Sequence, residues 1–165
     1  MSIKLFVMDV DGTMTDGTIY IGATGEMMKA FDVKDGYAIY HMLPAHNIIP
    51  VIITGRSSDI VTARAKELKI TELHQGVSDK LAVLASIAAE YGVTPNQIAY
   101  IGDDLNDLDA MSYCGYTACP ADAVDAVRKT AKYVCRSNGG HGAVREFVEF
   151  ILSPFRNSSP LIGGI

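Results

Sequence analysis

The strongest constraint on the fold is a series of short apolar runs, each followed at once by polar residues. Four runs have the length and composition of buried strands, at residues 3–10, 48–53, 98–101 and 116–119, and a weaker candidate lies at 132–135. Helical signals lie between them, at 59–68, 80–91, 122–131 and 142–152. Strands that are apolar throughout and alternate with helices predict a parallel sheet covered on both faces, a doubly wound, Rossmann-like α/β fold.

Residues 18–31 interrupt this alternation. They contain two β-prone runs around the segment Gly22–Gly25, which predicts a β-hairpin inserted into the α/β domain. An isolated hairpin is marginally stable in water, and this one carries Ile19, Ile21, Met27 and Phe31. We therefore expect it to pack either on its own domain or on another subunit, and the sequence leaves both options open.

Composition limits the class of protein. With 165 residues, of which 48% are hydrophobic, the chain can build one domain with a sizeable core. A net charge of −5 argues against nucleic acid as a partner. We expect no signal peptide and no membrane span, and three cysteines without metal-site spacing fit buried thiols in a reducing cytoplasm. We predict one domain over residues 1–152 and a flexible tail over 153–165.

The polar side chains that follow the apolar runs predict the position of a site. They are Asp9, Asp11, Thr54, Arg56, Lys80, Asp103 and Asp104. Because ligands of open α/β sheets bind beyond the carboxyl ends of the strands, we expect these side chains to converge on one rim. Carboxylates crowded together repel one another unless a cation lies among them, and their hard oxygen ligands suit Mg²⁺. Lys80 and Arg56 would neutralise a phosphoryl group beside that ion.

Two carboxylates two residues apart also suggest a mechanism. Asp9 can attack phosphorus as a covalent nucleophile, and Asp11 can protonate the leaving oxygen and later accept a proton from water. Asp103, helped by Asp104, would then hold the metal ion. The alternatives are a receiver module that acts as a phospho-switch without catalysis, and an inactive domain that binds a sugar phosphate.

The order of these motifs resembles the haloacid dehalogenase-like phosphatases. The resemblance rests on Asp9-Val-Asp-Gly-Thr13, Thr54, Lys80 and Gly102-Asp-Asp-x-x-Asp107. Over the chain through Leu152, further segments are similar to the family of 3-deoxy-D-manno-octulosonate 8-phosphate phosphatases. These segments include Asp16-Gly-Thr-Ile-Tyr20, Lys29-Ala-Phe31, Asp35-Gly36, Thr54-Gly-Arg56 and Gly139-Gly-His-Gly-Ala-Val-Arg-Glu146.

This resemblance implies a core without a large cap domain and a Mg²⁺-dependent hydrolysis of a phosphorylated 3-deoxy ulosonic acid to the free sugar acid and phosphate. It also implies a homotetramer, with hairpins that pair between subunits, in the cytoplasmic synthesis of a lipopolysaccharide sugar. The closely similar nonulosonate 9-phosphate phosphatases remain an alternative. Arg56 favours the eight-carbon sugar, because a positive group suits its carboxylate.

The resemblance further implies a role for each matching residue. Asp9 is the nucleophile and a metal ligand, Asp11 is the acid and base and binds the metal through its backbone carbonyl, and Asp103 is the remaining protein ligand. Thr54 and Lys80 hold the phosphoryl group. The substrate-side residues are Asp32, Val33, Lys34, Asp35, Gly36, Arg56, Arg64 and Asn106.

Simpler structural roles remain open for several of these residues. Asp35 can cap a helix that begins at Gly36, with or without a contact to substrate. Arg64 can be a solvated helix charge instead of a site residue. For His141 the glycine-rich sequence favours a loop role, and Arg145 can pair either with an acid on its own helix or with substrate.

Overall fold

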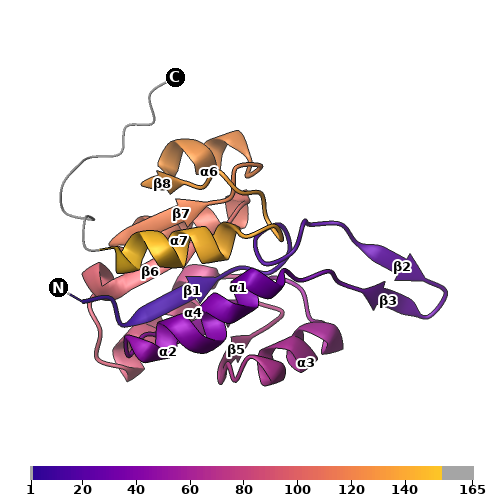
Figure 1. The fold of residues 1–165 in the computed structure, drawn as a ribbon, viewed down its shortest axis with the longest axis horizontal. Coiled ribbons are helices and arrows are strands. Elements are labelled where there is room, and N and C mark those ends of the chain that lie inside the picture. Colours follow the sequence, from indigo (N-terminus) through magenta and orange to yellow (C-terminus); the bar gives the residue numbers. More distant parts are fainter. Residues whose placement is uncertain (1, 154–165) are drawn as a thin grey trace.

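The computed structural model describes residues 2–153, and the structural statements below refer to them. A six-stranded sheet in the order β5-β4-β1-β6-β7-β8 forms the centre of the molecule (Figure 1). Every pair of neighbouring strands in it is parallel. The strands are β1 (Leu5–Met8), β4 (Ile49–Ile53), β5 (Glu72–His74), β6 (Ile98–Ile101), β7 (Tyr116–Cys119) and β8 (Tyr133–Val134). The predicted parallel α/β sheet is confirmed.

The continuous apolar sequence of β1 follows from its central place. All four of its side chains are fully buried, since β1 pairs with β4 on one side and β6 on the other. Alternate residues of a strand point to opposite faces. Accordingly Phe6 and Met8 belong to one core, and Leu5 and Val7 belong to the other.

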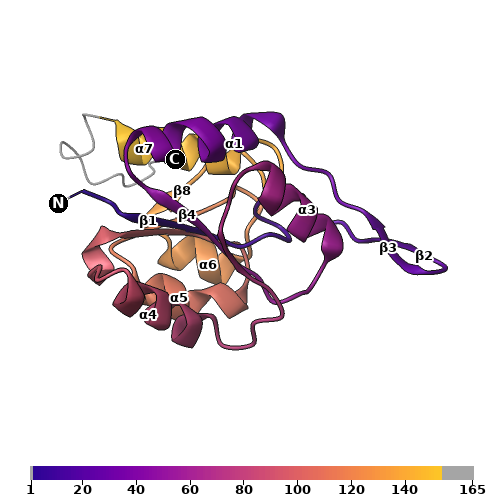
Figure 2. The same cartoon turned by 90° about the horizontal axis from the view of Figure 1, so that it is seen from below.

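Helices cover both faces of the sheet, as Figure 2 shows. One core contains side chains of the π-helix Ala38–Met42, which continues α1 (Val33–Tyr37) into α2 (Leu43–Ala45), and of α2, α3 (Asp59–Glu67) and α7 (Ala143–Leu152). The opposite core contains side chains of α4 (Lys80–Glu90), α5 (Leu108–Tyr113) and α6 (Asp125–Thr130). Short 3₁₀ turns at Pro95–Gln97 and Leu105–Asp107 precede β6 and α5. This is the predicted doubly wound arrangement.

Two elements were not expected from the sequence, and one helical stretch was expected only from Gly36 onward. The helical stretch from α1 to α2 carries Gly36 and Pro44, and both weaken a helical signal. The strand β5 is only three residues long and has no apolar run. α5 follows directly on an acidic segment that was interpreted as site loop alone.

The predicted hairpin is confirmed, with β2 (Tyr20–Gly22) paired antiparallel to β3 (Gly25–Met28) in a sheet of its own. It extends away from the body of the molecule (Figures 1 and 2). Ile21 is 73% exposed and Met27 66% exposed, whereas Phe31 at the base of the hairpin packs against the core. The described residues contain no large cap domain, as predicted. Residues 154–165 of the predicted tail lie outside the described residues.

Within residues 2–153, none of the helices combines the length and the apolar character that crossing a membrane requires.

Candidate active site at the carboxyl edge of the sheet

Three neighbouring strands deliver a polar side chain to one edge of the sheet. Asp9 follows β1, Thr54 follows β4 and Asp103 follows β6. Asp9 and Thr54 are only 5% and 2% exposed. Lys80, the first residue of α4, is also buried, and its ammonium lies 2.9 Å from Oδ1 of Asp9. Asp9 and Lys80 therefore lie together at this edge, with Thr54 and Asp103 at the ends of the two adjacent strands.

The loop after β1 is tightly folded around one carbonyl group. The backbone amides of Thr13, Met14 and Thr15 all donate to the carbonyl of Val10, at 3.2, 2.9 and 3.1 Å. Gly12 has a φ of +90°, and a Cβ at this position would overlap the carboxylate of Asp103. Glycine is therefore required here, because it tolerates this backbone conformation and lets Asp103 approach the loop.

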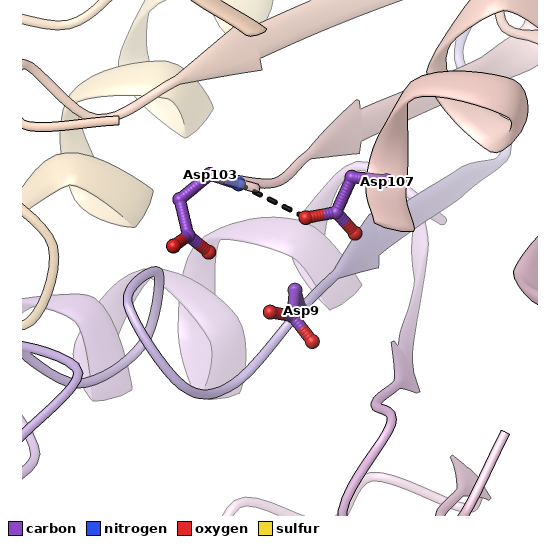
Figure 3. Close-up of side chains that lie close together, drawn as sticks. All are labelled: Asp9, Asp103 and Asp107. Atoms are coloured by element: carbon purple, nitrogen blue, oxygen red, sulfur yellow. Dashed lines mark hydrogen bonds between the residues drawn. The ribbon is translucent and has the colours of Figure 1, made fainter. Parts of the chain in front are cut away.

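Asp9, Asp103 and Asp107 form a carboxylate cluster in which one oxygen of each lies within 4.8 Å of the others (Figure 3). Burial raises the pKa of Asp103 to about 8, helped by the charge of Asp9. Burial also raises the pKa of Asp9 to about 6, as does the charge of Asp107, while Lys80 opposes the shift. Ionising these carboxyl groups together is therefore unfavourable, because their negative charges repel one another. A bound cation relieves this repulsion.

Asp107 differs from the other two members of the cluster because its hydrogen-bonding capacity is used within the protein. Its Oδ1 accepts from the Lys80 ammonium and the Tyr100 hydroxyl, both at 2.7 Å. Its Oδ2 accepts from the amides of Asp103 at 3.0 Å and Asp104 at 3.3 Å. Asp107 therefore fixes Lys80 and the loop that carries Asp103. Its place in the Gly102–Asp107 motif was the only sequence signal of this role, and Tyr100 gave none.

Asp104, predicted to help hold the metal, has a different role in the described structure. Its exposed side chain accepts from the amide of Leu105 at 2.7 Å and begins the 3₁₀ turn there. The cluster that could hold a metal ion does not include it.

The residues at the rim fit a magnesium ion. Asp9 and Asp103 supply two carboxylates from adjacent loops, and the Thr13 hydroxyl fixes Asp103 by donating to its Oδ1 at 2.9 Å. Such hard oxygen ligands suit Mg²⁺, which binds through one or two carboxylates and keeps positions for water and substrate phosphate.

Asp11, two residues after Asp9, contacts the hairpin. Its carboxylate forms an ion pair with the ammonium of Lys29, which follows β3. Arg56 lies 3.9 Å from Asp11 and 3.3 Å from Glu26 of β3. Lys29 and Glu26 were not predicted as site residues, although the Lys29-Ala-Phe31 segment was among the matching motifs.

The other predicted substrate-side residues fall into two groups. Arg56 and Asn106 lie at the rim, with Asn106 packed beside Gly55. Arg64 instead lies over the ring of Phe31, 5.5 Å from its centroid, and pairs with Glu67 at 2.8 Å. Gly36 packs against the same guanidinium group. Arg64 is therefore engaged at the base of the hairpin.

The segment from Asp32 to Gly36 begins α1. Asp32 caps this helix by accepting from the amide of Lys34 at 2.6 Å, and Val33 and Lys34 are exposed. The prediction that Asp35 caps a helix beginning at Gly36 is wrong, because α1 begins at Val33. Asp35 is buried and accepts from the amide of Arg145, 2.7 Å away in the first turn of α7. It is a cap between two helices that are 110 residues apart.

The glycine-rich turn before α7 packs directly against the loop after β1. A Cβ at Gly139 would overlap the carbonyl of Gly12, and Gly140 donates its amide to the carbonyl of Thr13 at 3.0 Å. His141 contacts the Gly139 carbonyl through Nδ1 at 2.8 Å. Arg145 pairs with Glu149 on its own helix at 2.6 Å. This turn supports the loop that carries Asp9 and Asp11.

Comparisons with known proteins agree with this geometry. Residues 54–147 match the model of a haloacid dehalogenase-like hydrolase family. A 3-deoxy-D-manno-octulosonate 8-phosphate phosphatase from Yersinia pestis is 46% identical over 92% of this chain and 80% of its own length. The chain belongs to this phosphatase family.

Solved structures of the family have the same fold. The Moraxella catarrhalis phosphatase, in complex with magnesium, phosphate and the KDO molecule, is 44% identical, with a TM-score of 0.87 over 91% of this chain and 86% of that one. A cobalt-bound Haemophilus influenzae phosphatase is 38% identical, with a TM-score of 0.87 over 92% of this chain and 88% of that one.

Proposed function

We propose that this chain is a magnesium-dependent phosphatase that hydrolyses 3-deoxy-D-manno-octulosonate 8-phosphate to the free sugar acid and inorganic phosphate. The observation that carries the proposal is the meeting of Asp9, Asp103 and Lys80 at one edge of the sheet. Membership of the phosphatase family supports the same reaction.

In the first step, a carboxylate oxygen of Asp9 forms a bond to phosphorus, and the bond from phosphorus to the sugar oxygen breaks. The sugar oxygen keeps the electron pair of that bond and takes a proton from Asp11. The free sugar leaves, and Asp9 carries the phosphoryl group. This division of roles agrees with the buried position of Asp9 and the more accessible edge position of Asp11.

In the second step, a water molecule forms a bond to phosphorus and gives a proton to the carboxylate of Asp11. The bond from phosphorus to Asp9 breaks, which restores the Asp9 carboxylate and releases phosphate. When bound between Asp9 and Asp103, Mg²⁺ supplies positive charge that offsets the charge of the phosphoryl oxygens. The Thr54 hydroxyl would donate a hydrogen bond to one of these oxygens.

Lys80 is suited to bind the phosphoryl group. Burial alone would lower its pKa, but the charges of Asp9 and Asp107 raise the pKa above the usual value. The ammonium therefore stays charged through neutral pH. Asp107 holds it 2.9 Å from the nucleophile oxygen, where a phosphoryl group would arrive.

The test is the release of phosphate from the octulosonate phosphate and from p-nitrophenyl phosphate. Asp9→Asn should lower kcat by at least about 10⁴-fold on both, because the amide is not a nucleophile. Chelation of divalent cations should abolish turnover, and added Mg²⁺ should restore it. Absence of turnover in the intact protein with Mg²⁺ would overturn the proposal. A higher kcat/KM on a nonulosonate 9-phosphate would instead reassign the sugar.

We further propose that the enzyme works in the cytoplasm as a homotetramer, with residues 1–152 as its one catalytic domain. The exposed Ile21 and Met27 of the hairpin support an interface between copies. The three cysteines are buried and unpaired, which suits a reducing compartment. Sedimentation of the purified protein tests the oligomeric state.

A further inference from the structure

Lys29 is a buried lysine at the base of an exposed hairpin. Its side chain is 1% exposed, although β3, directly before it, exposes Met27 and Met28. The ammonium forms an ion pair with Asp11 and lies 3.0 Å from Glu26. A buried ammonium is costly unless it is paired, so these two carboxylates must hold it in place.

Arg56 completes a group of two cations and two anions. Its guanidinium lies 3.3 Å from Oε1 of Glu26, the oxygen that also faces Lys29. The hydroxyl of Ser58 donates to the other oxygen of Glu26. This hydrogen bond and the contact with Lys29 lower the pKa of Glu26. Glu26 is therefore ionised at neutral pH, and it anchors Lys29 from the hairpin side.

The two oxygens of the Asp11 carboxylate have different surroundings. Oδ1 is bound by Lys29. Oδ2 faces Arg56 at 3.9 Å, which is longer than a hydrogen bond. Lys29 thus takes one oxygen and fixes the rotation of the carboxyl group, while Oδ2 keeps its capacity to exchange a proton with a reacting oxygen.

We propose that Lys29, fixed by Glu26, is a positioning residue that holds Asp11 through Oδ1 so that Oδ2 exchanges the proton with the leaving oxygen. The hairpin then contributes to the active site of its own chain. This inference rests on the proposed function, because it assigns a partner to the acid of that reaction.

Leaving-group dependence tests the proposal, because an alkyl phosphate needs protonation of its leaving oxygen and an aryl phosphate needs much less. The rate to compare is that of leaving-group release in a single turnover, because Asp11 also acts as the base of the second step on every ester. In Lys29→Met, we expect this rate on the octulosonate phosphate to fall by about 10² to 10³-fold, the scale of general-acid catalysis. On p-nitrophenyl phosphate it should fall by less than about 3-fold, since nucleophile and metal ligands are untouched. Lys66→Met, on an exposed lysine of α3, is the matched control and should change neither rate.

Two further variants keep the proposal falsifiable if Lys29→Met folds poorly. Glu26→Gln leaves Lys29 present but loosens its anchor, and should lower the single-turnover rate of leaving-group release selectively on the alkyl ester by about 10-fold. Lys29→Arg should recover part of that selective loss. Equal losses on both substrates in these variants would show a structural role only. A rise in KM for the sugar phosphate with unchanged kcat would show that Lys29 binds substrate, and either result overturns the proposal.

Failure of the proposed function has a different signature. If the intact enzyme hydrolyses other phosphate esters but not the octulosonate phosphate, the sugar assignment fails. The comparison of Lys29→Met then proceeds with an alkyl ester and an aryl ester that it does hydrolyse. If the intact enzyme hydrolyses no phosphate ester, both proposals fail.

Discussion

The carboxyl edge of the sheet buries polar side chains, whereas the hairpin exposes apolar ones. At the edge, Asp9, Lys80 and Asp107 are buried, and ion pairs hold them together. In the hairpin, Ile21 and Met27 face outward, and Lys29 is buried at its base. Both regions depart from the usual preference for apolar interiors and charged surfaces.

The two regions differ in what offsets the free-energy cost of these buried charges and exposed apolar side chains. At the edge, Lys80 pairs with Asp9 and Asp107 within the chain, and a bound cation would offset the remaining negative charge. Within the described residues, no part of the chain covers the exposed apolar side chains of the hairpin. We therefore expect damage to the edge to lower folding stability, and damage to the hairpin to alter assembly.

The largest effect on stability should come from Asp107→Ala. The substitution removes the shared partner of Lys80 and Tyr100 and leaves both buried without it. We expect the free energy of unfolding, measured in urea, to fall by about 3–5 kcal/mol. Asp109→Ala, at an exposed position in the next helix, is the control and should cost less than about 0.5 kcal/mol. A similarly small change for Asp107→Ala would remove the contrast between the two regions.

Asp35 supports a second, pH-dependent prediction. Burial raises its pKa from 3.8 to about 6, the amide of Arg145 opposes the shift, and Oδ2 has no hydrogen-bond partner among the described residues. The folded state therefore holds this proton more tightly than the unfolded chain, so the contribution of Asp35 to stability falls as pH rises from about 4 to 6.

Replacing Asp35 with Asn keeps an acceptor for the Arg145 amide and removes the titration. The stability of Asp35→Asn relative to the wild type should therefore increase by about 2 kcal/mol between pH 4 and pH 7. Urea unfolding at a series of pH values measures this difference. Asp32→Asn, at the less buried cap of α1, serves as the control. If this difference in stability does not change with pH, the pKa of Asp35 is not raised in the folded state.

The smallest effect on stability is expected in the hairpin. Replacing Ile19 and Ile21 with Lys changes side chains that are 46% and 73% exposed, and should alter monomer stability by less than about 0.5 kcal/mol per site. It should nevertheless shift the assembly toward monomers in sedimentation. Val134→Lys, on the edge strand β8, should leave the assembly unchanged. A hairpin variant that stays fully assembled would argue against an interface there.

Parts of this organisation were predictable from short segments of sequence. The runs that form β1, β4, β6 and β7 are apolar because both of their faces are buried, so their pattern does not depend on distant detail. The position of Asp9, Thr54 and Asp103 followed from the rule that the ends of parallel strands share an edge. Burial of Lys80 at the start of α4 agrees with the same rule.

Other parts depended on partners far away in the sequence. Asp35 looked like a local helix cap, yet it caps α7, which no local pattern indicates. Asp107 resembled one more acidic residue, but Tyr100 and Lys80 use its oxygens. Asp104 is an acidic residue of the same motif, but its exposed side chain caps the 3₁₀ turn instead. Residues of one chemical type thus acquire different roles from their surroundings.

The sequence alone determined the parallel sheet, the hairpin and the edge where the acidic residues meet, because hydrophobic periodicity and strand direction are properties of contiguous segments. The tertiary structure decided which carboxylates remain available and which are already bonded, and it placed Lys29 of the hairpin on Asp11. Such pairings depend on burial and on distances between residues far apart in the chain. No single segment of the sequence determines either of these.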